Sequence, residues 1–236
     1  MIRAWVLLGG VFLGAFGGVV GGWANQSEVM TSHDSSASLY RSVGRILLPV
    51  DLKVATSVIL DFSEYSKWAL DDINGDDANS QKFIALLRGM EFLVTPEKNS
   101  KDAPEEGVFD VFYDVDLIWP LGSKNNRVQL KVRGLERDSL GQVKRLRMEL
   151  AQSTLVLSSF FVLFEVKADT DRKAWVDFQC ETQFAGWIDT FFSVERYKRN
   201  IEWRLMKLMR NLAARTEGKA GISKKEVAGS EKLMAD

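Results

Sequence analysis

Residues 127–150, RVQLKVRGLERDSLGQVKRLRMEL, decide the fold class of this 236-residue chain. Apolar side chains alternate with charged or polar ones in both halves of the stretch: Val128, Leu130 and Val132 in the first, Leu146, Met148 and Leu150 in the second. This period of two is typical of antiparallel strands with one covered and one solvated face. Residues 137–141 between them, RDSLG, have the composition of a hairpin turn. The stretch therefore predicts part of an antiparallel sheet whose apolar face needs a cover.

Similar strand-like runs lie on both sides of this hairpin, at 39–50, 90–95, 107–119, 158–168 and 173–184. Between the first two, Asp51 can cap a helix that runs to Leu60, and a second helical piece follows at 62–70. The chain after the last strand predicts a long helix from about residue 187 to 212, with an apolar stripe formed by Val194, Ile201, Leu205, Leu208 and Leu212. The expected order is β-α-α-β6-α, an α+β fold in which the long helix covers the sheet.

The composition divides the chain into four parts. Residues 1–24 carry no charge from Ala4 onward, so they are either a signal peptide or an N-terminal membrane anchor. Residues 25–38 are polar and are expected to be a linker, 39–213 a single folded domain, and 214–236 a disordered tail. Both readings of the first part predict export, either as a periplasmic or secreted protein or as one tethered by an uncleaved helix.

The composition also removes several classes of function. Lysine and arginine number 31 against 32 acidic residues, a net charge of −1, so a nucleic-acid partner is not expected. A single cysteine, Cys180, excludes an intrachain disulfide framework and cysteine-based metal clusters. The single histidine, His33, falls in the predicted linker. We therefore expect no metal, no cofactor and no catalytic residue, and in particular no enzyme with a histidine relay. The chain is also expected to be a monomer.

Three stretches resemble the START-like, helix-grip superfamily, which includes polyketide cyclases and coenzyme Q-binding proteins. GRILLPVD at 44–51, followed by VILDFSEYSKW at 58–68, is similar to its first strand, first helix and Asp-aromatic-x-x-Tyr-x-x-Trp segment. Trp119-Pro120-Leu121 with Arg127 resembles the Trp-Pro…Arg-Asp element of lipid-binding START domains, although Val128 stands in place of the aspartate. IDTFF at 188–192, leading into IEWRL at 201–205, resembles the closing helix. The likeness covers about residues 40–213 and implies a curved antiparallel sheet wrapped around a long C-terminal helix.

The resemblance also implies an elongated apolar cavity between the sheet and the helix. The side chains expected to line it are those of the inward phase: Phe109, Val111, Tyr113, Leu130, Val132, Met148, Phe160, Val162, Phe164, Phe178, Phe191, Phe192, Ile201 and Leu205. The alternative is that these residues fill a solid core, since protein interiors are close-packed. Cys180 shares the inward phase and is interpreted as a small buried hydrophobe.

Two charged groups are interpreted as parts of the solvated face. Asp110, Asp114 and Asp116 share one face of their strand, where they can pair with Lys131 and Arg133 across the ladder. The basic run at 144–147 adds positive charge to the same face, which leaves attraction to anionic lipid headgroups as the functional alternative.

The expected function is an exported domain that binds or transfers a hydrophobic ligand: a lipid, an isoprenoid quinone or a sterol-like molecule. One alternative is a polyketide cyclase or dehydratase, which needs an inward acid–base group, with Tyr65 and Tyr113 as the candidates. Another is a filled domain that serves as a protein-interaction module of the cell envelope. A membrane surface is a further expected partner.

Overall fold

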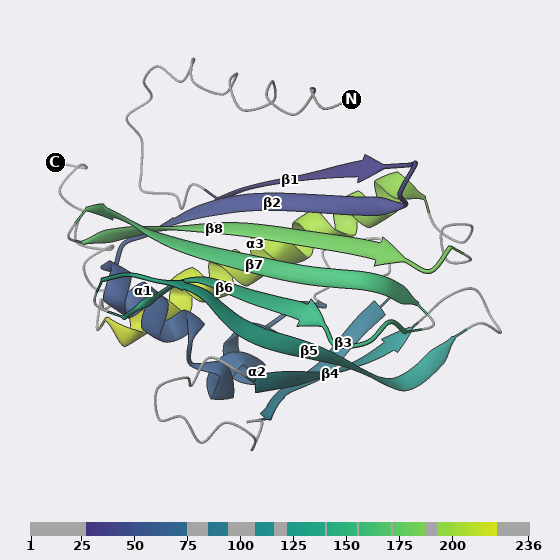
Figure 1. Cartoon of the computed structure of the whole chain (residues 1–236), viewed down its shortest axis with the longest axis horizontal. Coiled ribbons are helices and arrows are strands. Elements are labelled where there is room, and N and C mark those ends of the chain that lie inside the picture. The colour runs from purple at the N-terminus through teal and green to yellow at the C-terminus, as the bar shows by residue number, and fades with distance from the viewer. Residues whose placement is uncertain are drawn as a thin grey trace, which may run out of the picture.

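The computed structural model shows one sheet curved around one long helix (Figure 1). It describes residues 27–74, 85–93, 107–115, 122–139, 141–154, 156–170, 172–186 and 193–220. The elements are β1 (Ser27–Asp34), β2 (Leu39–Leu48), α1 (Leu52–Ile59), the 3₁₀ turn η1 (Phe62–Glu64), α2 (Tyr65–Trp68), β3 (Ala85–Leu93), β4 (Gly107–Val115), β5 (Ser123–Arg137), β6 (Val143–Leu150), β7 (Leu157–Thr170), β8 (Lys173–Phe184) and α3 (Val194–Lys219).

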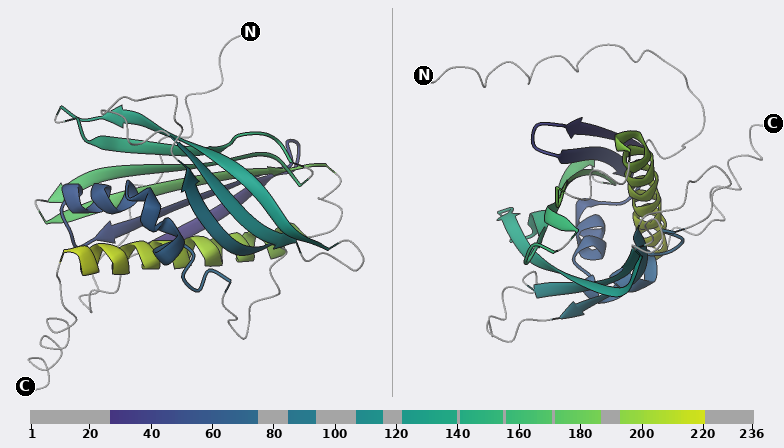
Figure 2. Two further views of the ribbon diagram at one scale, coloured as in Figure 1. Left: turned by 90° about the horizontal axis from the view of Figure 1, so that it is seen from below. Right: turned by 90° about the vertical axis from the view of Figure 1, so that its right-hand side faces the viewer.

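The eight strands form a single antiparallel sheet in the order β1-β2-β8-β7-β6-β5-β4-β3. The sheet curls so that its two edge strands approach α3 from opposite sides, and α1 lies inside the curve (Figure 2). The predicted helix-grip α+β fold is therefore confirmed. The period-two alternation also placed β8 correctly at both ends, 173 and 184.

Local sequence explains where the helices α1 and α3 begin. Asp51 accepts a hydrogen bond at Oδ1 from the backbone N–H of Val54, 2.8 Å away, and so caps α1. Ser193 caps α3 in the same way by accepting from the N–H of Arg196 at 3.2 Å. The apolar side of each helix then turns toward the sheet.

The expected linker at 25–38 is wrong for its described part, because Ser27–Asp34 is strand β1 and pairs along its whole length with β2. Its sequence, SEVMTSHD, carries little apolar signal because β1 is an edge strand that buries few side chains. Two strands, not one, therefore precede α1. His33 is also not outside the fold, since its ring stacks on Tyr40 with centroids 4.3 Å apart.

The predicted limits of the long helix are shifted. α3 begins at Val194 and continues to Lys219, so residues 214–219 belong to the helix and not to a disordered tail. The apolar stripe ends at Leu212, but Thr216 one turn later is fully buried and donates its hydroxyl to the carbonyl of Ala213 at 2.8 Å. A threonine with its hydroxyl satisfied inside the helix can occupy a buried position without an apolar side chain. Residues 1–24 and 221–236 lie outside the described part.

Two neighbouring residues of α3 contact opposite edges of the sheet. Glu202 accepts at Oε1 from the backbone N–H of Thr31 on β1, at 2.8 Å. Arg204 donates from Nη2 to the carbonyl of Ala85 on β3. The free edge of β3 is also covered by Asn74, whose amide donates to the carbonyl of Leu87 at 2.6 Å and accepts from its N–H at 3.0 Å. These contacts satisfy backbone groups that an open sheet would leave to water.

Candidate functional site: the layer between sheet and helix

The structure places the described side chains of the predicted lining on the inner face of the sheet and on the facing side of α3. Those that are buried in the common core are Phe109, Val111, Tyr113, Leu130, Val132, Met148, Phe164, Phe178 and Leu205. Phe160, Val162 and Ile201 pack against this core but remain partly exposed. Phe191 and Phe192 lie outside the described residues.

Burial on the inner face is uneven toward the end of the sheet away from α1. Near α1 the inward residues Ile46, Leu48 and Ala174 have no exposed surface. Toward the opposite end, Phe160 and Val162 on β7 keep part of their surface accessible, although they face inward in the same rows as the buried Thr182 and Cys180. On α3, Ile201 and Leu208 are also only partly buried. The layer is thus tightly filled beside α1 and more open to water away from it.

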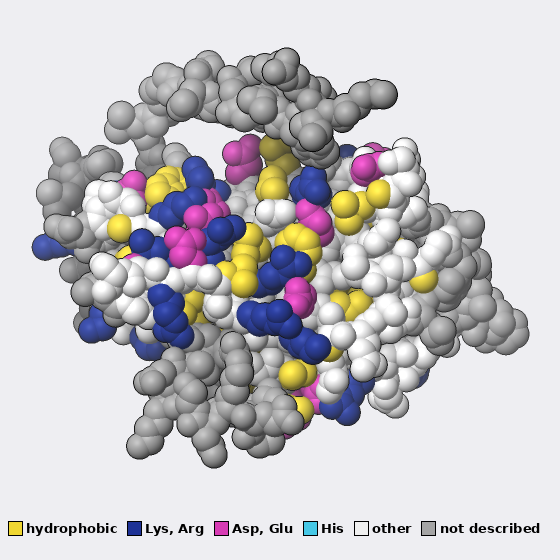
Figure 3. Space-filling view, in the orientation of Figure 1, with side chains coloured by type: hydrophobic (Ala, Val, Ile, Leu, Met, Phe, Trp, Pro, Cys, Tyr) yellow, Lys and Arg dark blue, Asp and Glu magenta, His cyan; other side chains and the backbone are white. Residues whose placement is uncertain are grey.

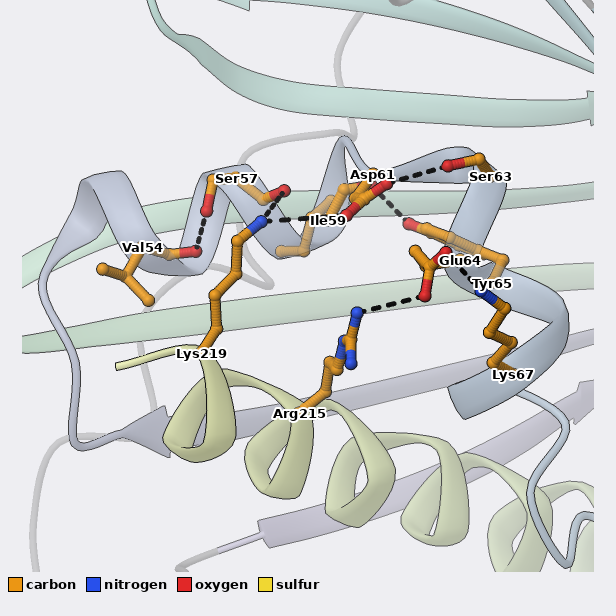
Figure 4. Close-up of polar contacts among 10 residues, drawn as sticks. All are labelled: Val54, Ser57, Ile59, Asp61, Ser63, Glu64, Tyr65, Lys67, Arg215 and Lys219. Atoms are coloured by element: carbon orange, nitrogen blue, oxygen red, sulfur yellow. Dashed lines mark hydrogen bonds and ion pairs between the residues drawn. The ribbon is translucent and has the colours of Figure 1, made fainter. Parts of the chain in front are cut away.

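The segment 61–68, which carried the family resemblance, divides its side chains between two directions (Figure 4). Its aromatic residues join an inner cluster: Phe62 lies 4.8 Å from Phe92, and Tyr65 lies 5.2 Å from Phe109, between ring centroids. The Tyr65 hydroxyl donates to the carbonyl of Ile59 at 2.6 Å. Burial raises the pKa of Tyr65, so the phenol stays neutral and serves as a fixed donor.

The acidic residues of the same segment meet basic residues of α3. Arg215 lies 3.2 Å from Glu64, and Lys219 lies 3.8 Å from Asp61. Farther along the helix, Lys207 pairs with Asp72 at 2.7 Å. These pairs are at least partly solvated, so each contributes on the order of 0–1 kcal/mol to stability. Together they align one side of α3 with the chain that follows α1.

Inward ionisable residues exist that the sequence analysis missed. Arg204 is largely buried, and this burial lowers its pKa to about 10, which still leaves it charged at neutral pH. Tyr197 packs on Tyr40 with ring centroids 4.3 Å apart, and burial raises its pKa. The signal for Tyr197 was present, because it precedes Ile201 by four residues on the apolar stripe.

The interpretation of the β4 aspartates as solvated is wrong for Asp110 and Asp114, which are buried at 4% and 8% exposure because basic and polar side chains cover them, and their partners differ from those expected. Asp110 pairs with Arg127 and accepts from Gln129 Nε2 at 3.0 Å, not from Lys131 or Arg133. Asp114 accepts from the backbone N–H of Asn125 at 2.9 Å, and Arg88 lies 2.7 Å away. The Asn125 hydrogen bond, followed by that of Arg88, lowers the pKa of Asp114. Asp116 lies outside the described residues.

The basic residues of the outer face are matched mainly by glutamates. Arg147 lies 2.9 Å from Glu149, and Arg145 lies 3.7 Å from Glu136. The face therefore shows interspersed positive and negative groups with apolar side chains between them (Figure 3). A shallow hollow of about 400 Å³ also lies on this side, over β1, β2, β7 and β8, beside the exposed Met30 and Val43.

A second hollow, between α1 and strands β6 and β7, is a narrow crevice too tight to hold a water molecule. Neither hollow lies between α3 and the middle of the sheet. Cys180 is a free, buried thiol, and burial raises its pKa to about 12. Across the described ranges, no group of three or more His, Cys, Asp or Glu side chains could hold a metal ion. None of the helices within those ranges is both long enough and apolar enough to cross a bilayer.

Solved structures of other proteins share this architecture. No family model and no curated protein sequence matches the chain. A START superfamily protein from Mycobacterium smegmatis matches with a TM-score of 0.50 and 12% identity, over 75% of this chain and 97% of that one. The di-domain aromatase/cyclase StfQ of the steffimycin biosynthetic pathway matches with a TM-score of 0.50 and 11% identity, over 79% of this chain and 53% of that one, so this chain spans about half of that protein. With its curved sheet closed by α3, the chain has the START-like, helix-grip fold.

Proposed function

We propose that this chain is an exported domain that binds or transfers a hydrophobic molecule, such as a lipid, an isoprenoid quinone or a sterol-like compound, between the inner face of the sheet and α3. The ligand is held by apolar and aromatic contacts, and the domain performs no chemistry on it. Export rests on the uncharged stretch at 4–24. The fold supports the binding role, because its neighbours include proteins described as START superfamily and as aromatase/cyclase.

The observation that carries this proposal is the incomplete burial of inward apolar side chains. Phe160, Val162 and Ile201 face the layer between sheet and helix, yet each keeps accessible surface while their neighbours toward α1 are sealed. Covering such surface is favourable by about 25 cal/mol per Å². A chain-like or ring-like apolar ligand lying along β7 and α3 would gain this energy without displacing the core.

The tyrosines expected to serve an enzyme do not favour catalysis. Tyr65 is committed to the carbonyl of Ile59. Burial raises the pKa of Tyr113, so its phenol is a poor base near neutral pH. Arg204 can bind an anionic group and stays protonated near neutral pH, because burial lowers its pKa only to about 10.

The test is direct binding. Native mass spectrometry of the gently purified chain, together with titration by fluorescent fatty acids and sterols, should detect an apolar molecule bound at one per chain. If no apolar molecule co-purifies and none of the probes binds, the ligand-binding function is wrong, and the filled interaction module becomes the better description.

The cyclase alternative draws support from the aromatase/cyclase whose fold this chain shares. It predicts that Tyr113→Phe abolishes turnover of a reactive poly-β-ketone while leaving its binding unchanged. Binding without turnover, in both the parent chain and the variant, favours the carrier.

A further inference from the structure

The folded sheet begins much closer to the uncharged N-terminal stretch than a linker at 25–38 would allow. β1 is paired with β2 from Ser27, opposite Ile46. The apolar stretch ends at Ala24, so Asn25 and Gln26 are the two residues between it and β1. Because an extended chain spans at most about 3.6 Å per residue, the Cα atoms of Ala24 and Ser27 are no more than about 11 Å apart. A bilayer that holds residues 4–24 would therefore have the start of β1 at its surface.

Strand register identifies the parts of the domain that share this end. Ser27, Ile46, Val176 and Val166 lie in one row across β1, β2, β8 and β7. Beyond this row come the β7–β8 hairpin, the β5–β6 hairpin and the first turn of α1, all at the same end of the molecule (Figure 1). We call this the tether end. The β1–β2 turn lies at the other end, one eight-residue strand or about 26 Å away.

The tether end carries exposed basic side chains. Lys53 in the first turn of α1 and Arg172 in the β7–β8 hairpin are exposed. Among the nearby acidic residues, Glu28 at the start of β1 is exposed, whereas three aspartates are oriented by hydrogen bonds within their own loops: Asp51 accepts from Val54 N–H at 2.8 Å, Asp138 from Gln142 N–H at 2.9 Å, and Asp169 from Trp175 Nε1 at 3.1 Å.

An exposed apolar residue completes this end. Leu135, close to the β5–β6 hairpin, is 49% exposed. Its neighbour Glu136 pairs with Arg145 opposite it. Exposed lysine, arginine and leucine side chains at one end of a domain are the residue types that attract a protein surface to anionic lipid headgroups.

We propose that the tether end is a membrane-facing surface, which rests on the anionic headgroups of the bilayer that holds residues 4–24 and points the β1–β2 turn away from it. This inference rests on the exported, tethered form of the proposed function. The two-residue connection limits the distance between the start of β1 and the bilayer surface. Lys53, Arg172 and Leu135 favour this orientation over a domain that rotates freely about its anchor.

The test uses the full chain in lipid nanodiscs that contain phosphatidylglycerol and a headgroup nitroxide quencher. One fluorophore is placed at the tether end by Thr170→Cys and another at the far end by Ser36→Cys, since both residues are exposed. The parent chain is the labelling control, because its Cys180 is buried. We expect at least about twofold stronger quenching at 170 than at 36. Equal or reversed quenching, or failure of the chain to associate with the discs, overturns the proposal.

A second comparison separates charge from tether length. Twelve Gly/Ser residues inserted after Gln26 relax the connection, and quenching at 170 should then persist only with anionic lipid. Lys53→Gln with Arg172→Gln in that background should weaken this surface binding about 25-fold, since each basic residue contributes about fivefold to binding an anionic surface. The matched control is Lys124→Gln with Arg199→Gln at the far end, which should have no effect. Unchanged quenching in the Lys53→Gln, Arg172→Gln protein overturns the role of these cations.

Ligand titration of the same proteins measures a separate property. A failure of the membrane-facing proposal is therefore distinguishable from a failure of the ligand-binding function.

Discussion

Tyr65 links three parts of the interior through one side chain. Its hydroxyl holds the carbonyl of Ile59 at the end of α1, and its ring packs against Trp68 of α2 and Phe109 of β4. All of these groups are buried. A polar atom in such a place is costly unless it has a partner, so the hydroxyl and the carbonyl depend on each other.

Replacing Tyr65 by phenylalanine should therefore lower the free energy of unfolding by about 1–3 kcal/mol, because the Ile59 carbonyl loses its donor without any change in ring packing. Urea unfolding followed by tryptophan fluorescence measures this. Ser63→Ala, on the exposed side of the same segment, is the control and should stay within about 0.5 kcal/mol. A Tyr65→Phe protein as stable as the parent would show that the hydrogen bond is not important.

Asp177 on the outer face of β8 predicts a dependence of stability on pH. Burial alone would raise the pKa of Asp177, but Arg45 at 2.5 Å and Lys167 at 2.9 Å outweigh it and hold that pKa below its usual value. The unfolded carboxyl titrates near about 3.9. The contribution is therefore fully present above about pH 4 and is lost as the pH falls through the lowered native pKa.

Asp177→Asn should consequently flatten the dependence of the urea midpoint on pH: between about pH 2 and 5, the midpoint of the variant should vary less than that of the parent chain. Parallel urea titrations across that range are the measurement. Identical slopes for the two proteins would mean that the Arg45 and Lys167 contacts contribute nothing in solution.

At the scale of elements, the edge strands depend on side chains from elsewhere in the chain. β3 pairs with β4 on one side only, and on its free side Asn74 takes the place of a strand by both donating to and accepting from Leu87. Arg204 reinforces the same edge from α3. Two polar residues therefore cover the free edge of β3, while its apolar side chains pack against the core.

Asn74→Ala should increase amide hydrogen exchange in β3, with the largest change at Leu87, because that residue loses both of its edge partners. Exchange in β7, which is flanked by strands on both sides, is the internal control. Peptide-resolved mass spectrometry gives both values in one experiment. Uniform acceleration across the sheet would contradict a local role for Asn74.

The elements differ in how far sequence patterning could define them. Strands with one solvated face, such as β6 and β8, were predictable because burial alone imposes the period of two. β1 was not, because an edge strand is specified by its partner β2 more than by its own residues. The end of α3 was missed for a related reason: Thr216 is buried by tertiary packing that no local pattern records.

At the scale of the whole molecule, the inner layer is sealed beside α1 and includes a few partly accessible side chains farther away. Leu205, at 6% exposure, belongs to the sealed core, whereas Phe160 on the facing sheet keeps accessible surface. The sequence could predict that both face inward, but not this difference, because it depends on where α1 fills the curve. For the same reason Arg204 could not be predicted as an inward residue, since its place depends on Asn74 and Ala85.

These two residues should respond differently to truncation. Leu205→Ala should destabilise the ligand-free protein by about 2–5 kcal/mol, because it leaves a cavity in packed surroundings. Phe160→Ala should lower the melting temperature much less but weaken binding of a fluorescent fatty acid by about tenfold, the effect of losing roughly 1.4 kcal/mol of contact. Thermal unfolding and titration on the same samples give the comparison. A Phe160→Ala protein that binds normally would place the ligand elsewhere.

The contacts of Glu202 with β1 and of Arg204 with β3 have a consequence for how the protein behaves in a crowded compartment. An uncovered strand edge is a template for aggregation, since its backbone donors and acceptors can recruit an edge from another copy. Because two residues within one turn of α3 contact both edges here, local unwinding of that turn would expose both together. α3 would thus limit polymerisation. If it also retains a ligand, as proposed, the openings that release the ligand would be the moments when the chain is most prone to form insoluble assemblies.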